Sequence, residues 1–310
     1  MERLDGGAGV PEALRGGIVA LGNFDGFHLG HQAVVGRARD RARAEGRPLL
    51  VATFDPHPVR FFKPDAAPFR LTTLDQRARL FADAGADAMV VFGFDAALAG
   101  LTAEDFVAER LVDRLGVAGV VTGDDFTFGK ARGGNVSVLA ALGERHGFSV
   151  DTVCAVGAGG EAVSSSRIRD LLKSGDPAGA AKLLTRPFAI EGVVQHGDKL
   201  GRTIGYPTAN VALGNYLRPA YGIYAVRVRL DDGRVVAGAA NLGIRPSFDP
   251  PKELLEAYLF DFAEDLYGRT IEVALIAYLR AEARFDSLDA LTAQMDADCT
   301  TARAVLAQRG

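Results

Sequence analysis

The sequence predicts two domains of different class: a Rossmann-like α/β domain, followed by a small antiparallel β-barrel with a C-terminal helix. In residues 17–153, short apolar runs alternate with helix-like stretches, which is typical of a mostly parallel sheet with helices on both faces. From about residue 186 the apolar residues instead recur at every second position, as in antiparallel strands. The chain has 310 residues, 48% of them hydrophobic, which is enough for two cores. We place the domains at residues 1–185 and 186–310.

The predicted strands of the first domain are almost continuously apolar, as a sheet buried on both faces requires. They lie at residues 18–21, 49–54, 88–92, 117–122 and 149–153. The helix-like stretches between them lie at residues 30–44, 73–84, 102–115 and 135–147. Ligands of such sheets bind at the carboxyl ends of the strands, so the loops that follow the strands are where chemistry is expected.

The second domain is predicted to be antiparallel. Residues 165–184 form two short helices that tether it, split at Gly175-Asp176-Pro177. The predicted barrel strands lie at residues 224–230, 235–240, 254–260 and 271–279. The turn Asp231-Asp232-Gly233 suits a hairpin between the first two of them. A helix-like run over residues 287–308 follows the last strand, which completes a barrel with a C-terminal helix.

Composition and charge exclude several classes of function. A net charge of −4 gives no electrostatic footprint for nucleic acid or an anionic membrane, so we expect neither as a partner. Cys154 and Cys299 lie far apart without metal-ligand spacing, so we expect both to be reduced and no structural zinc. The sequence shows neither a signal peptide nor an apolar run long enough for a membrane span, which favours a cytoplasmic protein. It leaves the oligomeric state open.

The loop after the first predicted strand reads G-N-F-D-G-F-H-L-G-H over residues 22–31. Its glycines let the backbone approach a ligand closely, and the helix that follows offers free amide donors to phosphate. His28 and His31 can contact phosphates as negative charge moves onto departing pyrophosphate. An H-x-x-H pair alone is also typical of a metal site or of polar surface, but the strand, loop and helix context favours phosphate binding.

Further polar segments fall where other strands should end. They are T-F-D-P-H-P at 53–58, G-D-D-F-T-F-G-K at 123–130 with Arg132 just downstream, and V-S-S-S-R at 163–167. Phe126 and Phe128 could stack on a planar ring, and Arg132 and Arg167 could neutralise phosphate. Either arginine alone is more often an ordinary surface charge. The prediction therefore depends on the convergence of these loops at one edge of the sheet.

The second domain opens with G-D-K-L-G-R-T-I-G-Y-P-T-A-N over residues 197–210, which is not a Walker loop. A cationic, glycine-rich loop followed by hydroxyl and amide side chains is nevertheless what Mg-ATP binding needs, with Thr208 and Asn210 near the cation. Glu256 lies in a strand-like segment, where an acid facing an apolar barrel is costly unless it is used or paired. A carboxylate there could accept the proton of an alcohol during phosphoryl transfer. Because successive side chains of a strand point to opposite faces, Glu256 could also face solvent.

The segments of the first domain, in this order, resemble the adenylyltransferase module of the bacterial bifunctional riboflavin kinase/FAD synthetase family. The loop at 22–31 alone would indicate only the wider nucleotidyltransferase superfamily, so the ordered set is the stronger signal. We expect residues 241–248 and 261–268, which flank Glu256, to be loops. The P-T-A-N segment, together with these two segments and residues 279–285, is similar to the riboflavin kinase module of the same family. The resemblance thus covers about residues 16–306.

For the first domain, the resemblance implies ATP as donor and FMN as acceptor. The residues implied to bind ATP are Gly22, Phe24, Asp25, Gly26, His28, His31, Ser164, Ser165 and Arg167, with the two histidines catalytic. Those implied to bind FMN are Asp55, His57, Asp124, Asp125, Phe126, Phe128 and Arg132. Asp125 stands where relatives often carry Asn.

For the second domain, the resemblance implies riboflavin and ATP as substrates and Mg²⁺ as the metal. The residues implied to bind the nucleotide are Gly197, Lys199, Gly201, Gly205, Thr208 and Asn210, the last two also as Mg²⁺ ligands. The flavin residues are Glu256, as general base for the ribityl 5′-hydroxyl, Arg280 and Phe285. Ser247 replaces the usual Thr and keeps its hydroxyl. The two modules together would convert riboflavin to FMN and then FMN to FAD.

Three alternatives remain open at this point. One module alone could be active, for example the kinase. The protein could be a non-catalytic flavin-binding sensor, although a sensor would not need Glu256 or the two histidines. A cytidylyltransferase fused to an unrelated barrel would consume CTP rather than ATP.

Overall fold

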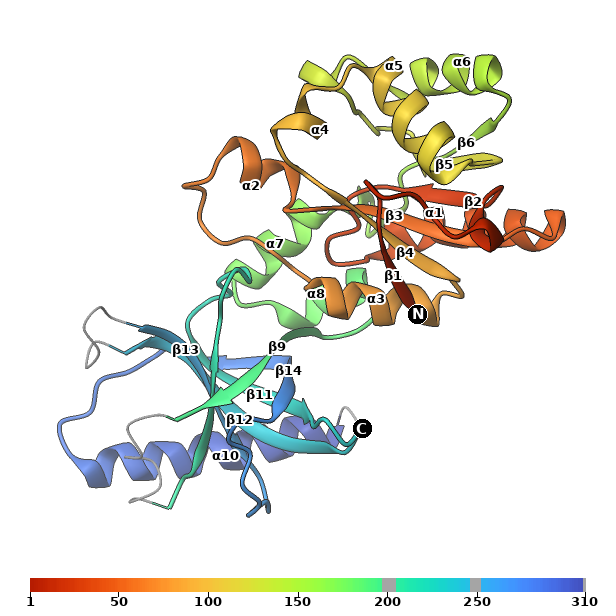
Figure 1. Cartoon of the computed structure of the whole chain (residues 1–310). Coiled ribbons are helices and arrows are strands. Elements are labelled where there is room, and N and C mark those ends of the chain that lie inside the picture. The colour runs from red at the N-terminus through yellow and green to blue at the C-terminus, as the bar shows by residue number, and fades with distance from the viewer. Residues whose placement is uncertain (197–204, 246–251, 309–310) are drawn as a thin grey trace. The chain divides into compact units, whose positions relative to one another are not determined.

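Residues 1–196, 205–245 and 252–308 are described here from a computed structural model of the chain (Figure 1). The chain divides into two compact units, one of residues 1–67 and 73–164 and one of residues 68–72 and 165–310. The division after residue 164 places the tether helices with the barrel. The boundary predicted after residue 185 instead marks where the pattern of strand residues changes. These helices are α7 (Ser165–Lys173) and α8 (Pro177–Leu184), split where predicted.

The first unit contains a six-stranded sheet in the order β1-β4-β3-β2-β5-β6, and every neighbouring pair is parallel. The strands are β1 (Glu2–Asp5), β2 (Ile18–Leu21), β3 (Leu49–Asp55), β4 (Ala88–Gly93), β5 (Gly119–Gly123) and β6 (Ser149–Val153). Five of them confirm the predicted strands. The edge strand β1 was not predicted because its four residues are mostly polar and exposed.

The predicted helices of this unit are confirmed within one or two residues. They are α1 (Leu29–Glu45), α3 (Leu74–Asp83), α5 (Ala103–Asp105) continuing into the π-helical segment η2 (Phe106–Leu115), and α6 (Val136–His146). Thr73 and Gln76 form a capping box at the start of α3, which satisfies amide groups that a helix end leaves open. The short elements not predicted are η1 (Glu12–Leu14), α2 (Pro58–Phe62), α4 (Ala96–Gly100), η3 (Lys130–Arg132), β7 (Gly157–Ala158) and β8 (Glu161–Ala162).

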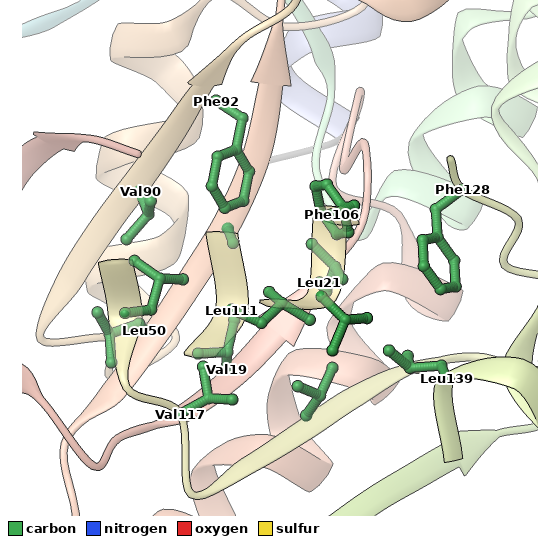
Figure 2. Close-up of a cluster of buried hydrophobic side chains, with 14 of the residues drawn as sticks. Val19, Leu21, Leu50, Val90, Phe92, Phe106, Leu111, Val117, Phe128 and Leu139 are labelled. Atoms are coloured by element: carbon green, nitrogen blue, oxygen red, sulfur yellow. The ribbon is translucent and has the colours of Figure 1, made fainter. Parts of the chain in front are cut away.

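Alternate side chains along each strand enter two separate cores, one on each face of the sheet. Val19 and Leu21 of β2 point into the cluster formed with η2 and α6 (Figure 2), whereas Ile18 and Ala20 pack against α1 and α3. All four are at most 1% exposed. Burial on both faces explains why the strands are apolar without alternation, and it confirms the predicted α/β architecture.

The order of the strands fixes where a ligand can bind. The chain moves from β2 to β3 and β4 on one side, then returns to β5 and β6 on the other side of β2. The carboxyl end of β2 is therefore the point where the strand order reverses, and open α/β sheets bind ligands at such points. The loop at residues 22–31 follows β2 directly.

The second unit is a closed antiparallel barrel, as predicted, and its strands follow the order β10-β13-β12-β11-β14-β9. The elements are β9 (Phe188–Gln195), β10 (Thr208–Ala212), β11 (Gly222–Arg229), β12 (Val235–Arg245), β13 (Lys252–Leu259), β14 (Thr270–Arg280) and α10 (Leu288–Gln308). One expectation is wrong, because residues 241–245, read as a loop, continue strand β12. Their backbone pairs with residues 252–256 of β13, a long-range constraint that local sequence does not report.

Helix α10 covers part of the outer surface of the barrel. Ala302 and Leu306 of the helix pack on Ala225 of β11 and Ala239 of β12 in one apolar cluster. Arg303 of the same helix lies over the ring of Phe260, with 4.2 Å between guanidinium carbon and ring centroid. In the part of the chain that the structure describes, no helix is long and apolar enough to cross a membrane.

The core cluster of Figure 2 makes a testable prediction about stability. Leu111 of η2 is 0% exposed there. We expect Leu111→Ala to lower the free energy of unfolding by about 2–5 kcal/mol, because it removes buried apolar contacts and leaves a cavity. Val59→Ala, at a site 42% exposed, should change it by less than about 0.5 kcal/mol. Urea denaturation followed by circular dichroism measures both, and equal effects would contradict the assigned core.

Candidate active sites

Buried aromatic side chains anchor the loop that follows β2. Phe24 and Phe27 are 1% and 4% exposed, and both rings pack edge-on against Phe81 of α3. Their φ angles are 50° and 43°, and that of Gly26 is 87°. Residues other than glycine rarely adopt positive φ angles, because the side chain then crowds the backbone. Burial of the two phenylalanine rings offsets the backbone strain that the turn requires. The loop is therefore held in one shape by the core beneath it.

The two predicted catalytic histidines lie together at the start of α1. Their rings stack with 3.6 Å between centroids, and His28 is 5% exposed. His28 caps the helix, since its Nδ1 accepts a hydrogen bond from the backbone N–H of His31 at 3.4 Å. A neutral His28 ring therefore carries its proton on Nε2, which can donate to a phosphate oxygen. A side chain at Gly30 would begin 3.2 Å from the His28 ring, so glycine makes room for it.

Arg77 is a site residue that sequence reasoning missed. It is 3% exposed, and its Nη1 donates to the Asn23 carbonyl at 3.1 Å and to Thr53 Oγ1 at 2.8 Å. Its guanidinium also lies 3.7 Å from the carboxylate of Asp55. Thr53 Oγ1 in turn donates to the Asn23 carbonyl at 2.8 Å. These contacts tie the loop after β2 to the end of β3. In the sequence, Arg77 is only one polar position of an amphipathic helix, so nothing local distinguishes it.

The predicted FMN residues follow β3 and β5. Asp55 ends β3, and His57 caps α2 by accepting a hydrogen bond from the Val59 amide at 3.2 Å. Beyond β5, the structure places three charged predicted residues on the exposed surface, namely Asp124, Asp125 and Arg132. Their assignment to FMN stays a prediction.

The two aromatic residues predicted to stack on a flavin differ in burial. Phe126 and Phe128 are stacked on each other, with ring centroids 5.7 Å apart. Phe128 is 7% exposed and points into the core beside Phe106 and Leu139 (Figure 2). Phe126 is half-buried at the margin of that cluster. Phe126 thus has the more accessible ring of the pair.

The serine segment spans the division between the units. Ser164 is the last residue of the first unit, and Ser165 and Arg167 lie in the first turn of α7 in the second. All three are half-buried. Their assignment to the ATP triphosphate stays a prediction.

In the barrel, strand register aligns three polar side chains in one row. Asn210 of β10 pairs directly with Glu256 of β13, and Glu256 pairs directly with Asn241 of β12. Two residues away along each strand, the neighbouring row consists of Thr208, Tyr258 and Ala239. Tyr258 and Ala239 belong to the apolar cluster between the barrel and α10. Side chains two residues apart share a face. The row Asn210–Glu256–Asn241, called the polar row below, therefore lies on the outer face beside α10 and not in the barrel interior.

Helix α10 contacts the surroundings of the polar row through two carboxylates. The hydroxyl of Tyr206, just before P-T-A-N, donates to Asp296, and this hydrogen bond raises the pKa of Tyr206 well above its usual value. Arg280 at the end of β14 donates to both oxygens of Asp298, at 2.8 Å and 2.7 Å. The ring of Phe285 lies 5.9 Å from the Arg280 guanidinium, so two predicted flavin residues are in contact.

The predicted metal ligands are oxygen donors on one face of β10. The Asn210 side chain is 6% exposed, and its Oδ1 is buried without a hydrogen-bond partner among the described residues. Together with the Thr208 hydroxyl it fits a hard cation such as Mg²⁺, which takes its other ligands from water and nucleotide phosphates. Across the described ranges, no group of three or more His, Cys, Asp or Glu could hold a metal.

Of the predicted nucleotide loop of the second unit, Gly205 forms a turn with φ of 89°. The other predicted residues of this loop, Gly197, Lys199 and Gly201, lie outside the described residues. Ser247 also lies outside them.

Comparison with known proteins gives the family. The family model for FAD synthetase matches residues 10–167, and that for riboflavin kinase matches residues 184–306. The chain belongs to the bifunctional riboflavin kinase/FAD synthetase family. The bifunctional riboflavin kinase/FMN adenylyltransferase of Escherichia coli K12 is 42% identical over 288 residues, 93% of this chain and 92% of its own length. The protein of the same name from Haemophilus influenzae is 39% identical over 304 residues, 98% and 99% of the two chains.

A solved structure shares the fold across both units. It is titled a macrolide-efflux protein from Streptococcus pneumoniae, is 31% identical, and superposes with a TM-score of 0.85 over 96% of this chain and 97% of its own. The family assignment and this structure confirm the predicted resemblance and fold class.

The contacts of Arg77 generate a prediction for the first unit. We expect Arg77→Met to lower FAD synthetase activity at least about tenfold, because the loop after β2 loses the donors that fix Asn23. Riboflavin kinase activity of the same preparation should stay within about twofold. Arg43→Met, at an exposed position of α1, is the matched control and should affect neither. Steady-state assays of FMN and FAD formation measure these rates. Equal loss of both activities would instead indicate general unfolding.

Proposed function

We propose that this protein makes FAD from riboflavin in two ATP-consuming steps, one in each unit. The barrel unit phosphorylates riboflavin to FMN, and the α/β unit adenylylates FMN to FAD with release of pyrophosphate. The observation that carries the proposal is that one chain presents both a stacked histidine pair at the switch point of the sheet and a half-buried carboxylate between two amides beside α10. Because both reactions consume ATP, the proposal places the protein in the cytoplasm.

In the kinase step, Glu256 accepts the proton of the ribityl 5′-hydroxyl as that oxygen attacks the γ-phosphorus of ATP, and ADP leaves. Thr208 and Asn210 would hold Mg²⁺, which when bound neutralises phosphate charge. The predicted loop residues, from Gly197 to Gly205, are assigned to the nucleotide. Arg280 and Phe285 are assigned to the flavin.

In the adenylyltransferase step, a phosphate oxygen of FMN attacks the α-phosphorus of ATP, and the bond to the bridging oxygen of pyrophosphate breaks. The Nε2–H of His28 and the amide groups at the start of α1 donate hydrogen bonds to phosphate oxygens as charge moves onto the leaving group. Asp25 and Gly26 shape the loop, and no side chain becomes covalently modified. Free ATP, FMN, riboflavin and FAD are the only partners that the proposal requires.

The histidine pair gives the test of the second step. We expect His28→Ala combined with His31→Ala to lower FAD formation at least about 100-fold, because the donors to the departing pyrophosphate are lost. Purified protein with riboflavin, ATP and MgCl₂, followed over time by HPLC, should then accumulate FMN. His146→Ala, exposed on α6, is the control and should form FAD normally. Consumption of CTP in place of ATP, or binding of flavin without product, would overturn the proposal.

Glu256 gives the test of the first step. We expect Glu256→Gln to lower FMN formation by about 10²- to 10⁴-fold, because the amide cannot accept the hydroxyl proton. Added FMN should still be converted to FAD at the normal rate. Glu264→Gln, which removes an exposed ion pair with Arg234, is the matched control in the same unit. Normal FMN formation by Glu256→Gln would exclude Glu256 as the base.

A further inference from the structure

The proposed kinase mechanism uses two members of the polar row and leaves Asn241 without a role. Glu256 has an amide side chain directly opposite on each neighbouring strand, Asn210 on β10 and Asn241 on β12. Directly paired residues project from the same face with Cβ atoms about 4.5–5.5 Å apart. Asn241 is therefore a direct neighbour of the general base, as Asn210 is, but on the opposite side.

The side-chain oxygen of Asn241 indicates a missing donor. Asn241 Oδ1 is buried and has no hydrogen-bond partner among the described residues, as is true of Asn210 Oδ1. A buried acceptor without a donor destabilises a folded protein, so such an atom needs an explanation, and a ligand that supplies the hydrogen bond is one. For Asn210 the proposed ligand is the metal. For Asn241 a different ligand is needed.

The position of Asn241 in the barrel indicates which substrate supplies that donor. Beyond β12, the pairing continues from Asn241 to Ile223 of β11 and from Ile223 to Arg280 of β14. Arg280 and Phe285 are the residues proposed to bind the flavin, whereas the P-T-A-N segment of β10 lies on the other side of Glu256. Asn241 thus stands on the flavin side of the base. The hydrogen-bond donors that riboflavin presents next to its reacting hydroxyl are the other hydroxyls of its ribityl chain.

We propose that Asn241 is a substrate-binding residue of the kinase site, whose Oδ1 accepts a hydrogen bond from the ribityl 4′-hydroxyl of riboflavin. The inference rests on the kinase activity proposed above. The 4′- and 5′-hydroxyls are on adjacent carbons, so acceptors on adjacent strands, Asn241 and Glu256, can each bind one of them. Binding of the 4′-hydroxyl fixes the rotation of the terminal carbon and directs the 5′-oxygen to the γ-phosphate.

The experiment compares riboflavin with 4′-deoxyriboflavin as substrates of the wild type and of Asn241→Ala, at saturating Mg-ATP. The wild type should lose about tenfold in kcat/KM when the 4′-hydroxyl is removed, the effect of one lost hydrogen bond to a buried acceptor. Asn241→Ala should lose about tenfold with riboflavin and nothing further with the analogue. The KM for ATP, obtained by varying ATP at saturating riboflavin, should not change. Asn215→Ala, in an exposed turn of the same unit, is the matched control and should behave as the wild type.

Three results would overturn the assignment. The first is that Asn241→Ala loses a further tenfold with 4′-deoxyriboflavin, so that the effects of the substitution and of the missing hydroxyl add. The others are that Asn241→Ala raises the KM for ATP and not that for riboflavin, and that its kinetics do not differ from those of the wild type. If Asn241→Ala fails to fold, Asn241→Asp replaces it, because it keeps shape and an acceptor oxygen and should still discriminate between the two flavins about tenfold. Equal rates with both flavins would then refute the proposal. A wild type that forms no FMN would refute the kinase function itself, which separates the two failures.

Discussion

Strand register determines which side chains meet in both units of this protein. In the barrel, the pairing of β10, β13 and β12 places Asn210, Glu256 and Asn241 side by side on the outer face. Because successive side chains of a strand point to opposite faces, a slip of one residue would turn Glu256 toward the apolar interior. The buried side chains of the barrel oppose that slip, since Leu255 and Ala257 of β13 would leave the core at the same time. The hydrophobic pattern that closes the barrel thereby also fixes the polar row.

In the α/β unit, the register of the parallel strands determines which strand ends lie side by side, and so which of the following loops can meet. Leu21 pairs with Ala52, so the loop after β2 begins beside the last residues of β3. Arg77 can then reach both Asn23 and Thr53 from α3. The loop itself is held from below by Phe24 and Phe27. A rigid support of this kind suits a site that stabilises charge on phosphates, since donors that are already oriented do not need to reorganise during the reaction.

The sequence predicted most strands and helices because their apolar residues carry a local signal. It did not predict β1, whose stability depends on pairing with β4 rather than on buried side chains. The last residues of β12 were also missed, because only the partner strand β13 defines them. For the candidate sites, motifs predicted the histidine pair and Glu256 from neighbours in the chain. Arg77 and Asp298 could not be found this way, since each acts on residues far away in sequence.

Helix α10 shows how one element can bury apolar surface and also organise a site. Asp296 and Asp298 hold Tyr206 on one side and Arg280 on the other, while Ala302 and Leu306 further along fasten the helix to the barrel. The Nε and Nη2 of Arg280 bind Asp298, and its Nη1 donates to the Ala281 carbonyl at 2.8 Å. These bonds use three of the five N–H donors of Arg280 and leave the face of its planar group for other contacts. That face lies over the ring of Phe285, and guanidinium faces attract aromatic rings, so stacking is one way in which the proposed flavin ring can contact Arg280.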